Sequence, residues 1–180
     1  MQQYLCCIRD TVCTTQGMMD LRLVRVDDRF IHGQILEAWI PYLGADGVVI
    51  INDRLSSDEF QKSIMEMALP DRIAFKVSSV DDAPKLKDNG LFKDKKVLII
   101  VSSLMDAFNI YNRGITFNRL NIGNLKVHNG SYQLSFSVWV DSKDIEIIKS
   151  LMAEGVYVAV QSVPREREIN VGDILEMIKL

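Results

Sequence analysis

One short segment of the chain holds the residue types that phosphoryl chemistry needs. Between Asp27 and Gln34 the sequence reads DDRFIHGQ, with an arginine three residues before a histidine and a glycine directly after it. A histidine side chain ordinarily titrates near about pH 6.5, so its neutral imidazole is available as a nucleophile that can take up a phosphoryl group. Arg29 offers a planar fork of N–H donors to phosphate oxygens, which suits a reaction governed by positioning and charge compensation. We therefore interpret His32 as a candidate phosphoryl carrier.

The residues beside His32 can complete such a site. Gly33 lets the backbone approach a ligand closely, and the amides of Gly33 and Gln34 can donate to phosphate oxygens. Asp27 or Asp28 could orient the imidazole through its second nitrogen and fix its tautomer, although Asp28 could equally brace the loop. Arg25 stays outside this set, because its reach depends on which face of the sheet it occupies.

The flanking segments place His32 in a turn between a strand and a helix. The apolar run 21–26 reads as the first strand, and residues 35–43 carry apolar side chains at helical spacing. Open α/β sheets bind their ligands at such turns, where the amino terminus of a helix also favours an anion. Trp39, within this helix, is expected in the core or in the wall of a groove.

The rest of the chain alternates between strand-like and helix-like segments. Fully apolar runs mark central strands at residues 48–51 and 97–101, and further strands are expected at 72–77, 119–124 and 156–160. Helices are expected between and after these strands. Two of them start after a serine cap, Ser56 or Ser57 in one case and Ser102 or Ser103 in the other, and three more are expected over 79–89, 141–154 and 171–179. This order predicts a three-layer α/β/α single domain with a mostly parallel central sheet.

The pattern changes late in the chain, where we expect an antiparallel hairpin. Asn129 and Gly130 form a strong turn signal, and apolar residues alternate with others from Leu134 to Val140. His128, just before this turn, is expected to be a solvated hairpin residue.

The composition is that of a globular protein, and it excludes several classes of function. The 180 residues include 48% hydrophobic and 25% charged side chains, and the net charge is −3. A chain of this length can form one core without disulfides or metals. It has no general basic surface for nucleic acid, and no apolar run approaches the roughly 20 residues of a membrane-spanning helix.

The first 19 residues are expected to be a poorly ordered extension of the domain, which covers residues 20–180. The segment has no clear apolar period, and we suspect a natural start at Met18 or Met19. It contains all the cysteines: Cys6, Cys7 and Cys13. Because their spacing is not that of a zinc knuckle and their number is odd, we expect no metal, no cofactor and no disulfide framework.

The segment around His32 resembles a known family. From Val26 to Ile35, followed by Trp39, it is similar to the signature of the IIB subunits of the mannose/fructose/sorbose family of the bacterial sugar phosphotransferase system (PTS). Phe30 and Ile35 stand where leucine and valine are more usual, and both exchanges leave the chemistry intact. The resemblance extends in order over about residues 21–179, through these segments: Asn52-Asp53, Ala68 to Pro70, Asn121 to Asn124, Gly155-Val156 and Val163-Pro164.

The resemblance implies a function and a place in the cell. His32 would be the phosphohistidine nucleophile of a phosphotransferase, with Arg29 stabilising the phosphoryl group, Asp27 orienting the ring, and Gly33 and Gln34 binding phosphate. The phosphoryl group would come from a IIA domain and pass to a sugar held by the membrane subunits IIC and IID. Such a protein is cytoplasmic and associates peripherally with those permease subunits, without nucleic acid as a partner.

Two other functions are compatible with parts of this pattern. A nucleotide-using transferase is suggested by Ile31, His32 and Gly33, but its signature needs a second histidine where Gln34 stands. The chain also lacks a Walker loop and a Gly-x-Gly-x-x-Gly turn. A non-catalytic binding or regulatory module on the same fold is the other alternative, since fold does not fix function.

Overall fold

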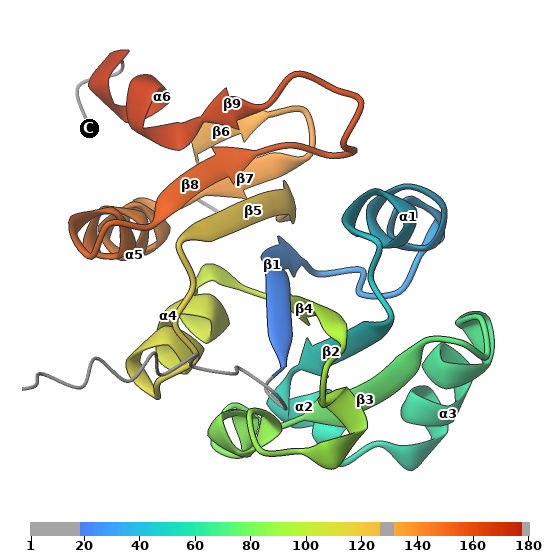
Figure 1. Cartoon of the computed structure of the whole chain (residues 1–180). Coiled ribbons are helices and arrows are strands. Elements are labelled where there is room, and N and C mark those ends of the chain that lie inside the picture. The colour runs from blue at the N-terminus through green and yellow to red at the C-terminus, as the bar shows by residue number, and fades with distance from the viewer. Residues whose placement is uncertain (1–18, 127–131, 178–180) are drawn as a thin grey trace, which may run out of the picture.

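The computed structural model describes residues 19–126 and 132–177, and its main feature is a twisted seven-stranded sheet (Figure 1). The strand order is β3-β2-β4-β1-β5-β8-β9, and all of these strands run parallel except β9, which pairs antiparallel with β8. The strands of the described residues are β1 (Asp20–Asp27), β2 (Gly47–Ile51), β3 (Ala74–Ser78), β4 (Lys96–Val101), β5 (Arg119–Asn124), β6 (Tyr132–Ser135), β7 (Val138–Val140), β8 (Tyr157–Val160) and β9 (Ile169–Asn170).

Helices cover both faces of this sheet. They are η1 (Ile35–Trp39), α1 (Ile40–Leu43), α2 (Asp53–Ser56), α3 (Glu59–Ala68), η2 (Ala83–Leu86), η3 (Gly90–Phe92), α4 (Leu104–Asn112), α5 (Ser142–Ala153) and α6 (Val171–Met177). One apolar core joins the sheet to η1, α1 and α2, and the other joins it to α4, α5, α6 and the β6–β7 hairpin. This architecture confirms the predicted α/β/α domain with a mostly parallel sheet and a late antiparallel hairpin.

The strand β1 marks the point where the order of the sheet reverses. The chain leaves β1 toward β2 and β3 on one side, returns through β4, and then adds β5 on the other side of β1. A crevice forms outside the carboxyl ends of parallel strands at such a point, because the connections diverge there. Asp27 is the last residue of β1, so the segment with candidate chemistry begins at this crevice.

Several local expectations were wrong in detail. The helix expected after Ser56 or Ser57 forms as α3, but its cap is the side chain of Asp58, and a further short helix, α2, precedes it with Asn52 as its cap. The polar helix expected at 79–89 is instead the short 3-10 turn η2, and a second such turn, η3, follows from Gly90. Ser103 does cap α4, as one of the two alternatives predicted.

The late hairpin lies at a different place from the turn that the sequence suggested. The apolar alternation from Leu134 to Val140 predicted one continuous strand, but a turn at Phe136 and Ser137 folds it into β6 and β7. The burial of Leu134, Val138 and Val140 explains the apolar spacing, while Phe136 is 97% exposed at the tip. Asn129 and Gly130 lie outside the described residues.

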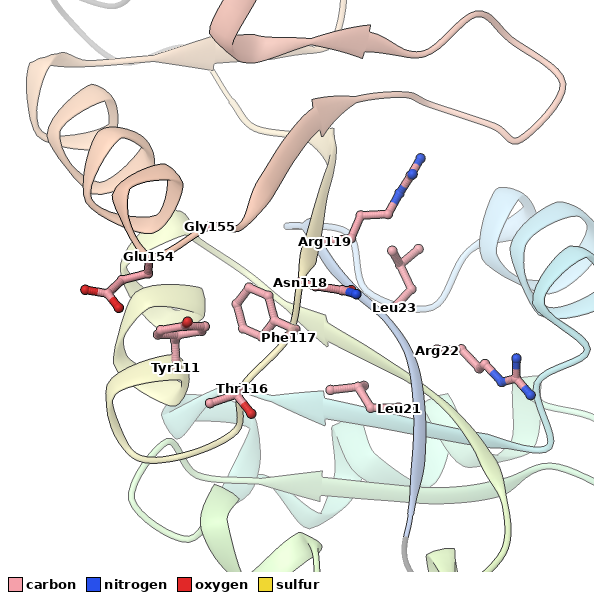
Figure 2. Close-up of a pocket in the computed structure, with 10 residues that line it drawn as sticks. All are labelled: Leu21, Arg22, Leu23, Tyr111, Thr116, Phe117, Asn118, Arg119, Glu154 and Gly155. Carbon is pink, nitrogen blue, oxygen red and sulfur yellow. The ribbon is translucent and has the colours of Figure 1, made fainter. Parts of the chain in front are cut away.

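A cavity of about 490 Å³ lies at the opposite edge of the sheet, near the amino ends of β1 and β5 (Figure 2). Leu21, Arg119 and Glu154 are among its lining residues. None of the residues singled out between Asp27 and Gln34 lines it. Parallel sheets bind ligands at their carboxyl edge, so the functional site is expected at the other end of β1.

Candidate functional site

A tight turn after β1 brings His32 back toward the end of the strand. The amide of Phe30 donates to the carbonyl of Asp27 at 3.2 Å, which closes the turn. Phe30 has a φ of 55°, in the left-handed region that side chains other than glycine seldom adopt. Its ring is partly buried against the core on the face of η1, so packing holds this unusual backbone in place.

The buried carboxylate of Asp27 is the centre of the site. Its Oδ2 lies 3.0 Å from Nε2 of His32 and 2.9 Å from an Nη of Arg25. Arg29 donates to both carboxylate oxygens, from Nε at 3.0 Å and from an Nη at 3.1 Å. The structure therefore brings together Asp27, Arg29 and His32, the three residues that the sequence suggested for catalysis.

The charges around Asp27 keep its carboxylate ionised. Burial acts to raise the pKa of Asp27, but hydrogen bonds from His32 and Arg29 and the charge of Arg25 outweigh it, so the pKa lies well below the usual range. An ionised carboxylate can only accept hydrogen bonds. Nε2 of His32 therefore carries a proton directed at Asp27, and in the neutral form of the ring Nδ1 carries the lone pair. The His32 side chain is 18% exposed.

Arg25 contacts the centre of the site, although sequence reasoning left it out. Its side chain is fully buried, and it faces the same side of β1 as Asp27. Besides Asp27, it donates to the Asn121 side chain on β5 and to the carbonyls of Gln161, at 3.0 Å, and Ser162, at 3.1 Å. Burial lowers the pKa of Arg25, and the attraction of Asp27 opposes this effect. An arginine remains charged even so.

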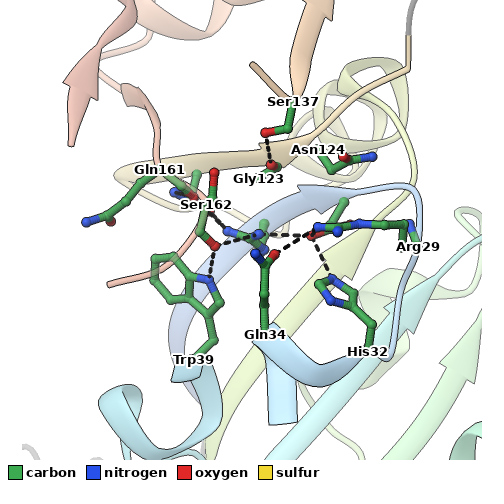
Figure 3. A network of polar contacts seen from close by, with 12 residues as sticks. Arg29, His32, Gln34, Trp39, Gly123, Asn124, Ser137, Gln161 and Ser162 are labelled. Carbon is green, nitrogen blue, oxygen red and sulfur yellow. Dashed lines mark hydrogen bonds and ion pairs between the residues drawn. The ribbon is translucent and has the colours of Figure 1, made fainter. Parts of the chain in front are cut away.

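Gly123 makes room for this buried guanidinium. In the pairing of β1 with β5, Val26 is opposite Ile122 and Asp27 is opposite Asn124, so Gly123 is an extra residue that bulges from the ladder. A Cβ at Gly123 would lie 1.8 Å from an Nη of Arg25. The carbonyl of Gly123 accepts a hydrogen bond from the Ser137 hydroxyl at 3.0 Å, which ties the bulge to the β6–β7 turn (Figure 3).

Trp39 forms the other side of the Arg25 pocket. It is 3% exposed, and its ring centroid lies 4.9 Å from the guanidinium carbon of Arg25. Its Nε1 donates to the carbonyl of Ser162 at 2.9 Å. It belongs to the π-helix η1, a form of helix that is often found at functional sites. Trp39 thus lies in the core beside the site, as one of the two predicted alternatives.

Gly33 and Gln34 lie where the loop joins η1, at the edge of a cavity of about 590 Å³. A Cβ at Gly33 would meet no heavy atom within 4 Å, so the backbone is open on that side. The side chain of Gln34 accepts a hydrogen bond from Arg29 at 3.0 Å. The opposite wall of the cavity is formed by Val163, Pro164 and Arg165.

Asp28 braces the loop from outside. Its carboxylate accepts from the side-chain amide of Asn124 and lies 3.1 Å from Nζ of Lys126. It makes no recorded contact with His32 in the described part of the chain, whereas Asp27 does. Of the two neighbouring acids, Asp27 is therefore the one placed to orient the ring. His128 lies outside the described residues.

Comparison with known proteins decides the family. The model of the "PTS system sorbose subfamily IIB component" family matches residues 21–180. The N-acetylgalactosamine-specific phosphotransferase enzyme IIB component 2 of Escherichia coli K12 is 32% identical over 162 residues, which are 88% of this chain and 100% of that protein. The chain belongs to the sorbose subfamily of PTS IIB components.

Two further relatives of this IIB component bear on its fold and organisation. The IIBSor domain of the sorbose permease from Klebsiella pneumoniae has a crystal structure that superposes with a TM-score of 0.81 at 28% identity, over 88% of this chain and 98% of that one. The mannose-specific EIIAB component of Escherichia coli K12 is 25% identical over 89% of this chain, but the match covers 50% of that protein.

The IIB family accounts for the type of chemistry that the site offers. Members are sugar-transport phosphotransferases, and a histidine held beside an arginine and an ionised carboxylate suits that chemistry. Within residues 19–126 and 132–177, no helix of this IIB component is long and apolar enough to span a membrane. The same residues contain no cluster of three metal-ligating side chains.

Proposed function

We propose that this protein is a cytoplasmic phosphocarrier that accepts a phosphoryl group on His32 and passes it to a sugar during uptake. The observation that carries the proposal is the contact between His32 Nε2 and the ionised carboxylate of Asp27 at 3.0 Å. Because Asp27 occupies Nε2, the nitrogen left to attack phosphorus is Nδ1. The product is therefore an Nδ1-phosphohistidine.

The proposed reaction moves one phosphoryl group through two displacements. In the first, the lone pair of Nδ1 attacks phosphorus, the N–P bond of the donor breaks, and the imidazole of His32 becomes positively charged because Nε2 keeps its proton. Asp27 stabilises that charge at hydrogen-bond distance. In the second, a sugar hydroxyl attacks, the Nδ1–P bond breaks, the hydroxyl proton is released, and the ring leaves as neutral imidazole.

The proposed roles of the neighbouring residues follow from their positions. Arg29 lies beside His32 with a side chain that is 40% exposed, so it can turn from Asp27 toward the phosphoryl oxygens and compensate their charge. The amides of Gly33 and Gln34 adjoin the cavity and can donate to the same oxygens.

The proposed partners are a phosphorylated IIA domain as donor and the membrane subunits IIC and IID, with their bound sugar, as acceptor. The family supports this sequence of transfers, and the mannose-specific relative is itself named as an EIIAB component.

The test is incubation of the purified protein with a phosphorylated IIA domain, followed by ³¹P NMR at neutral to alkaline pH. We expect one phosphoramidate resonance, assigned to the Nδ1 isomer, that disappears on acidification and is absent from His32→Ala. Phosphorylation by a nucleotide instead of the IIA domain would favour a nucleotide-using transferase. The absence of any phosphorylation would favour a non-catalytic module.

A further inference from the structure

Two arginines bind the same carboxylate, but their surroundings differ. Arg25 and Arg29 both contact Asp27 at 2.9 to 3.1 Å. The Arg25 side chain is fully buried, whereas the Arg29 side chain is 40% exposed. We propose that Arg25 is a positioning residue: it is the permanent counter-charge that holds Asp27 on His32 while Arg29 leaves Asp27 for the phosphoryl group. The proposal rests on the phosphocarrier function above.

The contacts of Arg25 fix it in one position. It donates to acceptors on three segments of the sheet's carboxyl edge, which are Asp27 on β1, Asn121 on β5 and the carbonyls of Gln161 and Ser162 after β8. Trp39 lies against its face. A planar guanidinium with this many fixed partners cannot rotate away without leaving several buried acceptors unpaired.

Arg29 has far fewer constraints. Apart from Asp27, its recorded side-chain partner is Gln34, at 3.0 Å and on the exposed side of the loop. Both Nε and one Nη of Arg29 are engaged by Asp27, so it cannot present that edge to a phosphoryl group without releasing the carboxylate. If Arg29 were the only counter-charge, each turnover would leave Asp27 buried with no arginine beside it.

This division of roles has a consequence for the tautomer of His32. With Arg25 in place, Asp27 stays ionised and oriented, so Nε2 keeps the proton and Nδ1 keeps the lone pair throughout the cycle. Displacement of Arg25 would free Asp27 to follow Arg29. The imidazole would then populate both tautomers, and the fraction with a nucleophilic Nδ1 would fall.

Gly123→Ala displaces Arg25 without removing its charge. The new Cβ would lie 1.8 Å from an Nη and 2.0 Å from the guanidinium carbon, so the flexible end of Arg25 must move. Gly90→Ala is the matched control, since a Cβ there meets no heavy atom within 4 Å. Arg25→Met removes the charge, and Arg25→Lys restores a charge without the fork.

The measurements are the rate of phosphoryl uptake from a phosphorylated IIA domain and the ¹⁵N NMR spectrum of the His32 ring. For Gly123→Ala and Arg25→Met we expect the saturated rate to fall by roughly a hundredfold, as misplaced reacting groups do, with little change in KM because the buried Arg25 cannot touch the donor. The spectrum should change from one tautomer to a mixture. Arg25→Lys should recover part of the rate.

The outcomes separate this inference from the proposed function. Folded Gly123→Ala and Arg25→Lys proteins that keep the wild-type rate and a single Nε2-protonated tautomer would overturn the positioning role. If Arg25→Met fails to fold, the other two variants still decide the question. If the wild-type protein takes no phosphoryl group, the proposed function fails, while the tautomer measurement still tests the action of Arg25 on Asp27 and His32.

Discussion

At the scale of single residues, the proposed function gives Arg29 two tasks that compete for the same donors. It is paired with both oxygens of Asp27, and the phosphoryl group proposed for His32 would need the same N–H donors. Exchange between two acceptors is possible because the side chain is partly exposed and contacts with water replace those that it loses. The ion pair with Asp27 keeps Arg29 close to the position where the proposed phosphoryl group would bind.

We predict that Arg29→Ala slows phosphoryl uptake by roughly a hundredfold or more, equivalent to about 3 kcal/mol of lost charge stabilisation. Arg29→Lys should restore only part of the rate, because a point charge does not replace a planar fork of donors. Single-turnover measurements with a phosphorylated donor provide the comparison. Wild-type rates in the alanine variant would show that Arg29 serves the loop structure alone.

The low pKa of Asp27 predicts how stability depends on pH. The pKa of an aspartate in an unfolded chain is about 3.9, and that of Asp27 in the folded protein is lower. The stabilisation that ionised Asp27 gives the fold is therefore complete above the unfolded pKa and is lost as the pH falls through the folded pKa. At neutral pH, Asp27→Asn should be less stable by about 3 kcal/mol, since it leaves buried Arg25 without its counter-charge.

Urea unfolding of both proteins from pH 7 to pH 2 tests this prediction. The difference in the free energy of unfolding between wild type and Asp27→Asn should be largest above about pH 4 and should shrink below it. A difference that stays constant over this range would mean that the ionisation of Asp27 does not stabilise the fold.

The sequence predicted the residues of the loop but not the residue that holds them. Arg29, His32 and Asp27 lie within six positions of one another, so their proximity follows from local chain geometry. The partners of Arg25 are separated from it by 96 residues at Asn121 and by 136 at Gln161, and only the strand register brings them together. One signal was available: an arginine within an apolar strand, two positions before an aspartate, implies a buried ion pair.

At the scale of elements, the bulge of β5 matters more than any helix for the geometry of the site. Gly123 leaves the ladder between Ile122 and Asn124, and the space that it vacates is filled by Arg25. The alternating pattern from Leu134 could not reveal that Ser137 turns the chain and supports this bulge. One continuous strand, and two strands joined by a two-residue turn, give the same alternation of apolar residues when both strands bury the same face.

The capping of α5 offers a test at this scale. Asp141 accepts from the amide of Asp144 at 2.8 Å, and Asp144 accepts from the amide of Asp141 at 3.1 Å, which is a reciprocal capping box. We expect Asp141→Ala to lower the free energy of unfolding by about 1 kcal/mol and to leave phosphoryl uptake unchanged.

Thermal and urea unfolding measure the stability, with Glu146→Ala as the matched control on an exposed position of the same helix. The control should stay within about 0.5 kcal/mol of wild type. Loss of transfer in Asp141→Ala, with the fold retained, would show that α5 is coupled to the site in a way that the contacts do not explain.

At the scale of the whole molecule, the loop with His32 lies at the carboxyl edge of the sheet, whereas the cavity lined by Leu21 and Arg119 lies at the amino edge. The α/β/α architecture was predictable because its elements have clear patterns in the sequence. Strongly apolar runs indicate buried strands, and capped segments with helical apolar spacing indicate helices. The position of β1 between β4 and β5 was not predictable, since strand order depends on contacts between distant segments. That order places His32 just beyond the carboxyl end of β1, at the point where the strand order reverses.

One prediction at this scale concerns the first 17 residues of the chain. They lie outside the described residues, while Met19 packs against the core. We expect deletion of Met1 to Gly17 to leave phosphoryl uptake intact and to shift the midpoint of thermal unfolding by no more than a few degrees, equivalent to about 1 kcal/mol or less. A large loss of stability would mean that this segment packs on the domain.

The central claim is that His32 is the residue that carries the phosphoryl group, and peptide mapping by mass spectrometry at neutral pH tests it most directly. After incubation with a phosphorylated IIA domain, we predict one phosphoryl group per chain, located on the peptide that contains His32 and lost on mild acid treatment. Under the same conditions, His32→Ala should remain unmodified. Phosphate on His128 instead, or equal labelling of His32→Ala, would contradict the account.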